Sequence, residues 1–350
     1  MSRILVTGGT GYIGSHTCLA LLKNNYKITI LDSLANSKIK TIDKIKEIAK
    51  GKDKKNSSDI NFELGDIRDL EFLEKVFSNQ LSKGCNFEGV IHFCGLKSVA
   101  ESMNQQLNYW DVNVNGTINL IKLMKKYHCH NLVFSSSATV YGNNHNIPIK
   151  ETSEIKPVNT YGQTKAVIEK FLKDIQEEFD SKFKIAALRF FNPVGAHYSG
   201  LIGELPLGTP NNIFPLILDT ASGIQEKLNI YGKDWPTHDG TAIRDYIHVM
   251  DVGESHIRIL EYLISNKPNY LCLNVGTGIG TSVLELIKVF EKVNKVEVPF
   301  VFSKRRCGDV PYLVADNFFL KSKFNIFPKR NIEDICRDAW NWRLLNPKGY

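Results

Sequence analysis

The sequence lacks the features that stabilise secreted and membrane-spanning proteins. No apolar run approaches the roughly 18–20 residues that a membrane helix needs. We expect no secretory leader, because the sequence leads directly into the short apolar run Ile4-Leu5-Val6 and a glycine-rich turn. Seven cysteines are scattered with no Cys-x-x-Cys pair, at Cys18, Cys85, Cys94, Cys129, Cys272, Cys307 and Cys336. This distribution is typical of free thiols in a reducing compartment, so we expect a cytoplasmic protein.

Metal-ligand spacing is also lacking. His128 and His130 stand two residues apart and would not share a helical face. His92 falls within an apolar run, which favours a hydrogen-bonded core residue. We predict no metal site.

Positive charge is only mildly in excess, and the net charge is +7. Much of it comes from lysines at 38, 40, 44, 46, 50, 52, 54 and 55. No aromatic residues interleave with them, so we interpret the segment as a solvated helix followed by a loop over 51–59. A nucleic-acid binder remains an alternative, which strongly salt-dependent association would reveal.

The 350 residues are 43% hydrophobic and 23% charged, as in a globular protein with a large core. Apolar runs at 4–6, 27–31, 61–64, 90–94, 131–135 and 184–190 read as strands. Helical patterns lie between them at 12–24, 41–49, 70–80, 111–127 and 161–179. This alternation predicts an α/β fold, a doubly wound parallel sheet of the Rossmann type.

The pattern changes after Asn192-Pro193, where glycine and proline become frequent. We expect a dinucleotide-binding domain over 1–191 and a smaller C-terminal α/β substrate lobe over 192–350. Segments near 235–255 are expected to return to the Rossmann sheet.

A glycine-rich turn follows the first predicted strand. Gly8, Gly11 and Gly14 have a GxxGxxG spacing and lead into a helix. Such a turn lets the backbone approach a pyrophosphate at the helix N-terminus. Asp32 ends the next strand, where a carboxylate accepts hydrogen bonds from ribose hydroxyls and repels a 2′-phosphate. The pattern therefore predicts NAD rather than NADP. Asp66 and Ile67, after the third strand, are candidates for holding the adenine.

A second constellation lies further along the chain. Tyr161 and Lys165 stand one helical turn apart, so the ammonium would lie beside the phenol and lower its pKa. Ser137 ends the preceding strand, at the sheet edge where doubly wound folds place their ligands. Together they predict a catalytic tyrosine that exchanges a proton with a sugar hydroxyl. Lys97, Arg244 and Arg306 are candidate phosphate ligands.

The ordered motifs are more specific than any one of these signals. They are TGGTGYIGSH, LDSL, GDIR, VIHFCGLK, FSSSATVYG, YGQTK, RFFNPVGAH, PNNIFP, RDYIHVMDV and LNVGTG. Over nearly the whole chain they closely resemble the UDP-glucose 4-epimerase family of extended short-chain dehydrogenases/reductases.

The resemblance implies C4 epimerisation of a UDP-hexose through a 4-keto sugar, a homodimer, and NAD retained between turnovers. It implies Tyr161 as the base, assisted by Lys165 and Ser137. The implied NAD positions are Gly8, Gly11, Tyr12, Ile13, Gly14, Asp32, Asp66, Ile67, Phe93, Lys97, Tyr161 and Lys165. The implied UDP-sugar positions are Lys97, Ser137, Tyr161, Phe191, Asn192, Asn212, Ile213, Tyr231, Arg244, Arg306, Asp309 and Leu313.

Four features depart from the family pattern, and one of them, YGQTK in place of YGKSK, keeps both the tyrosine and the lysine. Cys94 replaces a usual alanine, and the lysine-rich stretch near 50–59 is not typical. Leu313 stands where some members carry a bulky tyrosine, so turnover of N-acetylated UDP-hexoses is a further hypothesis. A dehydratase would need an acid and a base beside Ser137, where Ala138 and Thr139 stand. That reaction and a non-enzymatic NAD sensor remain the alternatives.

Overall fold

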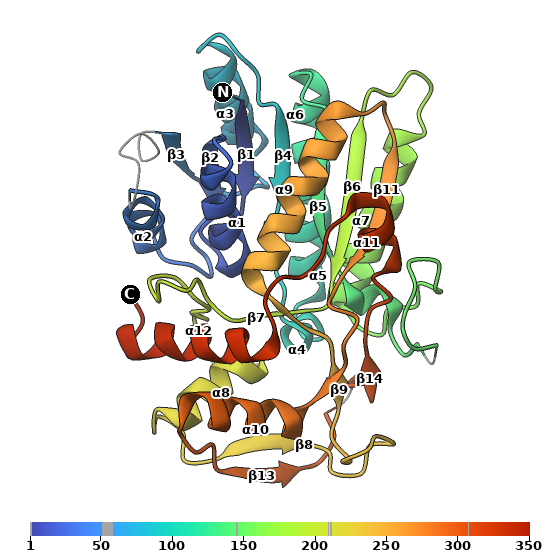
Figure 1. Ribbon diagram of the computed structural model, residues 1–350. Coiled ribbons are helices and arrows are strands. Elements are labelled where there is room, and N and C mark those ends of the chain that lie inside the picture. The colour runs from blue at the N-terminus through green and yellow to red at the C-terminus, as the bar shows by residue number, and fades with distance from the viewer. Residues whose placement is uncertain (1, 51–58, 145, 209, 211, 307) are drawn as a thin grey trace.

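The computed structural model describes residues 2–50, 59–144, 146–208, 210, 212–306 and 308–350 (Figure 1). Of the lysine-rich segment, Lys40–Ala49 forms helix α2. The loop predicted over 51–59 lies outside the described residues except for Asp59. No helix of the described part is long and apolar enough to cross a membrane.

Seven parallel strands form one sheet in the order β11-β6-β5-β4-β1-β2-β3. Their bounds are β1 (Arg3–Thr7), β2 (Lys27–Asp32), β3 (Ile60–Leu64), β4 (Gly89–His92), β5 (Asn131–Ser137), β6 (Lys184–Phe190) and β11 (Tyr270–Val275). The order reverses at β1, where the chain moves from one half of the sheet to the other. The predicted doubly wound Rossmann sheet is confirmed.

Helices cover both faces of this sheet (Figure 1). One face carries α1 (Tyr12–Lys23) and α9 (Val249–Ser265), and the other carries α3 (Leu70–Leu81), α6 (Gly116–Lys126) and α7 (Thr160–Gln176). Along β1, Ile4 and Val6 belong to the first core and Leu5 to the second. Strands buried on both faces need apolar residues at successive positions, which explains the unbroken apolar runs of the sequence.

The helix predicted over 111–127 is not one regular helix. It starts as a π-turn, Trp110–Asn115, and only then continues as α6. Two short helices precede it, α4 (Val99–Ser102) and α5 (Gln106–Tyr109). A π-turn inserts one extra residue, and here it brings Asn113 into the interior, where its side chain bonds to the chain after β4.

The smaller lobe lies below the sheet in Figure 1 and has its own core. Its helices are α8 (Ile213–Ala221), α10 (Val283–Asn294) and α12 (Ile332–Leu345). Its strands form short pairs and a triplet: β8 (Leu228–Tyr231) with β13 (Phe300–Ser303), β7 (Asn192–Val194) with β10 (Tyr246–His248), and β9 (Ile243–Arg244) between β12 (Thr281–Ser282) and β14 (Tyr312–Leu313).

The chain returns to the large sheet through residues that overlap the end of the expected 235–255 segment and extend beyond it. Strands β9 and β10 stay in the small sheets, because they are only two and three residues long and pair with other short strands. The return is made by α9, which packs on α1, and by β11, which pairs with β6. A last short helix, α11 (Phe318–Phe324), packs against β11.

Candidate active site

The glycine-rich turn joins β1 to α1 at the carboxyl edge of the sheet. Gly8 has a φ of +72°, which favours glycine. A Cβ on Gly14 would lie 2.2 Å from the carbonyl oxygen of Gly8, so only glycine lets the helix approach the turn this closely. Gly11 caps α1 without a side-chain hydrogen bond. The first N–H groups of α1 are therefore available to a phosphate.

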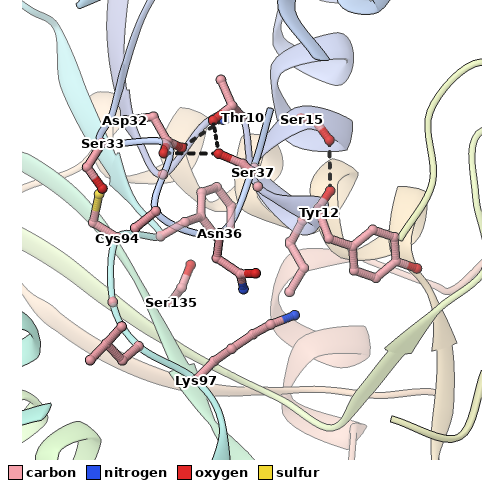
Figure 2. Close-up of a pocket in the computed structure, with 18 of the residues that line it drawn as sticks. Thr10, Tyr12, Ser15, Asp32, Ser33, Asn36, Ser37, Cys94, Lys97 and Ser135 are labelled. Carbon is pink, nitrogen blue, oxygen red and sulfur yellow. Dashed lines mark hydrogen bonds between the residues drawn. The ribbon is translucent and has the colours of Figure 1, made fainter. Parts of the chain in front are cut away.

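Asp32, at the end of β2, is only 7% exposed and faces the same turn. Its carboxylate accepts hydrogen bonds from the backbone N–H groups of Thr10 (3.1 Å) and Leu34 (2.9 Å) and from the Ser37 hydroxyl (3.2 Å). Figure 2 shows Asp32 with Thr10 and Ser37 in this cluster. The carboxylate is thus held rigidly at the sheet edge, where a ribose would lie.

A cavity of about 340 Å³ opens between these groups, within the size range of small-molecule sites. All the residues predicted to bind the cofactor line it: Gly8, Gly11, Tyr12, Ile13, Gly14, Asp32, Asp66, Ile67, Phe93, Lys97, Tyr161 and Lys165. Cys94 lines it too. The lining residues fit a dinucleotide: the N-terminus of α1 would hold its pyrophosphate, and Asp32 and Ile67 would hold its adenosine.

Asp66 is engaged with a neighbour. Arg68 donates to both of its oxygens and to Asp111, and this pairing lowers the pKa of Asp66. The carboxylate is therefore fixed and charged at the pocket wall.

Tyr161 lies in the first turn of α7 and is 8% exposed. Asn159 caps this helix through the backbone N–H of Gly162, at 2.8 Å. Burial raises the pKa of Tyr161 to about 12, and hydrogen bonding with Ser137 opposes that rise. The expected lowering of the Tyr161 pKa is therefore not found in the protein alone, because burial outweighs the hydrogen bond with Ser137.

Lys165 stands one turn further along α7 and is 5% exposed. Its ammonium donates to the carbonyl oxygen of Ser135 at 2.8 Å and lies 5.9 Å from the ring centroid of Tyr161. Burial lowers the pKa of Lys165 to about 8. Ser137, Tyr161 and Lys165 thus meet where β5 and α7 adjoin, as the sequence predicts.

A buried ion pair behind this cluster was not predicted. Arg189 on β6 donates from Nε to both oxygens of Glu169 on α7, at 2.9 and 3.1 Å. Both side chains are nearly inaccessible to solvent. Ser136 also donates to Glu169, and Arg189 reaches the hydroxyl of Tyr141 at 2.9 Å. The network fastens α7 to the strands that carry the catalytic candidates.

Asn113, in the π-turn, was also missed. Its side chain accepts from the backbone N–H of Leu96 at 2.7 Å and donates to the carbonyl of the same residue at 3.1 Å. It further donates to the hydroxyl of Thr164, at 3.1 Å. Asn113 thereby ties the loop that carries Lys97 to the helix that carries Tyr161.

Four residues predicted for the UDP moiety, Tyr231, Arg244, Arg306 and Asp309, lie in the smaller lobe and do not line the cavity. The guanidinium of Arg306 lies 4.6 Å from the Tyr231 ring centroid, and its Nε donates to Asp309 at 3.1 Å. Arg244 donates to the carbonyl oxygens of Ile243 (2.9 Å) and Val310 (2.8 Å). Burial lowers the pKa of Arg244, and the charge of Asp309 opposes this effect.

Two further predicted residues, Lys97 and Asn212, meet between the two lobes at Glu204, which the sequence analysis missed. One carboxylate oxygen of Glu204 lies 2.8 Å from the amide of Asn212 and 3.6 Å from the ammonium of Lys97. Ile213 follows as the first residue of α8 and packs on the lobe's core.

The remaining predicted residues lie where β6 leaves the sheet. Phe191 and Leu313 share a small apolar cluster with Ala138 and Val140, which directly follow Ser137. The backbone N–H of Asn192 donates to the carbonyl oxygen of Asp245, at 3.1 Å. Leu313 is therefore close in space to the catalytic candidates, although neither it nor Phe191 lines the cavity.

A dinucleotide-type sheet with a Ser/Tyr/Lys cluster at its carboxyl edge defines an extended short-chain dehydrogenase/reductase. Residues 5–339 match the family model described as GDP-mannose 4,6 dehydratase. UDP-glucose 4-epimerase 2 of Arabidopsis thaliana is 45% identical over 347 residues, 99% of this chain and 96% of that protein. UDP-glucose 4-epimerase of Bacillus subtilis is also 45% identical, covering 99% of this chain and 98% of its own length.

Solved structures agree with these relatives. The UDP-glucose 4-epimerase of Stenotrophomonas maltophila, with bound NAD and formylated UDP-arabinopyranose, superposes with a TM-score of 0.92 at 41% identity, covering 99% of this chain and 98% of that one. The enzyme of Bifidobacterium longum, in complex with NAD+ and UDP, gives 0.92 at 36% identity, with 100% of each chain covered. This chain belongs to the UDP-glucose 4-epimerase family.

Proposed function

We propose that this protein catalyses the NAD-dependent, reversible epimerisation of UDP-galactose and UDP-glucose at C4, a reaction of galactose metabolism. The observation that carries the proposal is the cluster of Ser137, Tyr161 and Lys165, in which Tyr161 and Lys165 line the cavity and Ser137 bonds to Tyr161. The full-length similarity to proteins named UDP-glucose 4-epimerase supports it.

Tyr161 is the proposed base, which takes the proton of the C4 hydroxyl and later returns it. NAD, when bound, supplies the acceptor and donor of the C4 hydride and a positive ring charge that lowers the phenol pKa. Ser137 holds the reacting oxygen by a hydrogen bond, and Lys165 adds positive charge near the phenol. Loss of the proton and hydride leaves a 4-keto sugar. This intermediate must rotate within the site, so that the hydride returns to its opposite face.

This rotation requires that the site hold the sugar loosely and the UDP firmly. The charged residues of the smaller lobe suit the second task. Arg244, Arg306 and Lys97 are proposed to bind the diphosphate, while Tyr231, Asn212 and Ile213 contact the UDP moiety. Phe191, Asn192, Asp309 and Leu313 complete the proposed substrate site.

We also propose a homodimer formed through α5 and α7, which contact each other. Three apolar side chains near them are exposed: Leu107 (87%), Met103 (50%) and Val167 (42%). Such a surface is typical of a subunit interface. Light scattering after gel filtration should give twice the chain mass for the wild type and a monomer for Leu107→Glu. A wild-type monomer would contradict the proposal.

A cytoplasmic location is proposed as well, supported by the cysteines. All six in the described part of the chain, Cys307 excluded, are free thiols. Proteins of oxidising compartments instead commonly join their cysteines in disulfide bonds.

Proton NMR of the protein with UDP-galactose, UDP-N-acetylgalactosamine and NAD tests the reaction directly. Appearance of UDP-glucose is the expected result. If no gluco epimer forms while NAD binding is demonstrated, the epimerase proposal is wrong.

A further inference from the structure

Glu204 lies at the junction of the two lobes, as a buried carboxylate that is 8% exposed. Its backbone is packed from both sides. A Cβ on Gly203 would lie 2.5 Å from the Trp342 ring, and a Cβ on Gly349 would lie 2.7 Å from the Leu205 side chain, so both neighbours of Glu204 are closely packed. Glu204 is therefore held in one place by the C-terminal helix and the residues after it.

Its two partners are less constrained. Lys97 comes from the loop after β4, and its side chain is 50% exposed. Asn212 is an exposed residue directly before α8. Both reach one oxygen of Glu204, the amide at 2.8 Å and the ammonium at 3.6 Å. The fixed carboxylate thus orients one donor from each lobe.

Asn212 does not act as its position would suggest. It is the N-cap residue of α8, and asparagine there normally accepts a hydrogen bond from the first helical turn. Its side chain makes no such bond, and its amide donates to Glu204 instead. Pro215 has no N–H, so the first turn of α8 offers the N–H groups of Ile213 and Phe214, without a side-chain cap, next to the amide of Asn212. Two such donors near an ammonium suit a phosphate.

We propose that Glu204 is a positioning residue for the UDP diphosphate, keeping Lys97 and Asn212 oriented for its oxygens. An ammonium has three N–H donors and an amide has two, so each retains a donor after bonding to Glu204. This proposal rests on the proposed function, since it takes the UDP-sugar as the ligand.

Calorimetric titration of the NAD-loaded protein with UDP, and separately with uridine, tests the role. Glu204→Ala should weaken UDP binding at least tenfold and change uridine binding less than twofold, because uridine lacks the diphosphate. Glu204→Gln should stay within threefold of wild type, since its amide oxygen still accepts from Asn212. The control is Glu226→Gln, which makes the same charge change at a residue that is 91% exposed.

Asn212→Ala provides a second test that leaves the buried position intact. It should also weaken UDP binding, and the double variant with Glu204→Ala should be no more than twofold weaker than Glu204→Ala alone, because Glu204 acts through Asn212 and Lys97. Fully additive losses would overturn the proposal. So would a Glu204→Ala protein that binds UDP within threefold of wild type, or one that loses UDP and uridine affinity alike.

Steady-state kinetics separate this inference from the reaction itself. With UDP-galactose, Glu204→Ala should raise KM about tenfold and change kcat less than threefold. A wild type that binds UDP but does not epimerise UDP-galactose would refute the proposed reaction and leave the role of Glu204 standing.

Discussion

The ammonium of Lys165 lies 5.9 Å from the ring centroid of Tyr161 and gives its hydrogen bond to the Ser135 carbonyl. Lys165 therefore lies near the ring without a hydrogen bond to the phenol, while Ser137 interacts with the phenol by a hydrogen bond. Ser137 and Lys165 thus both act on the proposed reaction through Tyr161. Loss of the Tyr161 hydroxyl should therefore lower the rate of the chemical step more than loss of either neighbour.

Tyr161→Phe should lower kcat by about 10²–10⁴-fold, the usual contribution of a general acid–base group. NAD content should stay within twofold of wild type, because only a hydroxyl is removed. Conversion of UDP-galactose followed by NMR gives the rate. Tyr198→Phe is the control, since Tyr198 is 72% exposed. A Tyr161→Phe enzyme with more than a tenth of wild-type kcat would exclude the tyrosine as the base.

Arg189→Met should destabilise the protein by about 3–5 kcal/mol, because it leaves the carboxylate of Glu169 buried and unpaired. Adding Glu169→Met should restore part of the loss. Urea unfolding measures both. Arg258→Met removes an exposed ion pair and should cost less than about 1 kcal/mol. If both arginine variants lower the free energy of unfolding equally, the buried ion pair stabilises the protein no more than an exposed one.

Acid should destabilise the fold through His92, whose pKa is lowered to about 3 by burial and, secondarily, by the charge of Lys165. The unfolded chain protonates this residue near pH 6.5 and the folded protein only near 3. Between these values the unfolded state binds the extra proton, so the free energy of unfolding falls as the pH falls.

Replacing His92 by Gln should reduce this slope by about 1.4 kcal/mol per pH unit. The measurement is urea unfolding from pH 7 to pH 4. His238→Gln serves as the exposed control. An unchanged slope in His92→Gln would mean that His92 does not titrate as described.

Leu313→Tyr should abolish turnover of UDP-N-acetylgalactosamine and leave UDP-galactose turnover within about threefold. The larger side chain would occupy space near Phe191 that an N-acetyl group needs. NMR with both substrates measures the two rates, with Leu344→Tyr as an exposed control. The hypothesis fails if the wild type itself does not convert the N-acetylated sugar.

Gly14→Ala should lose bound NAD, because the new Cβ would lie 2.2 Å from the Gly8 carbonyl oxygen and push α1 away from the turn. Gly11→Ala should be milder, with its nearest contact at 3.2 Å. NAD released on acid denaturation gives the content of each variant. Retention of full NAD content by Gly14→Ala would show that the helix can shift without cost.

The sheet and the clustering of the catalytic candidates could be predicted because each depends on local signals. Apolar runs mark buried strands, and Tyr161 and Lys165 are one helical turn apart. Those signals place each residue at one edge of the sheet, where the structure finds them together.

The supporting residues could not be predicted, because their partners are distant in sequence. Nothing near Glu204 indicates a contact with Lys97, and nothing near Arg189 indicates Glu169. The short strands β9 and β10 have too few residues to show alternation, so their pairing in the small sheets could not be predicted. The raised pKa of Tyr161 reflects burial, which no motif reports.

The order of strands has a consequence for how the protein is made. Strand β6 pairs with β5 on one side and with β11 on the other. The chain from β7 to α9, which includes α8 of the smaller lobe, is synthesised between β6 and β11. During synthesis the nascent chain therefore exposes an open sheet edge until residue 275 has left the ribosome. The cofactor lobe, although it begins at the N-terminus, cannot finish folding first.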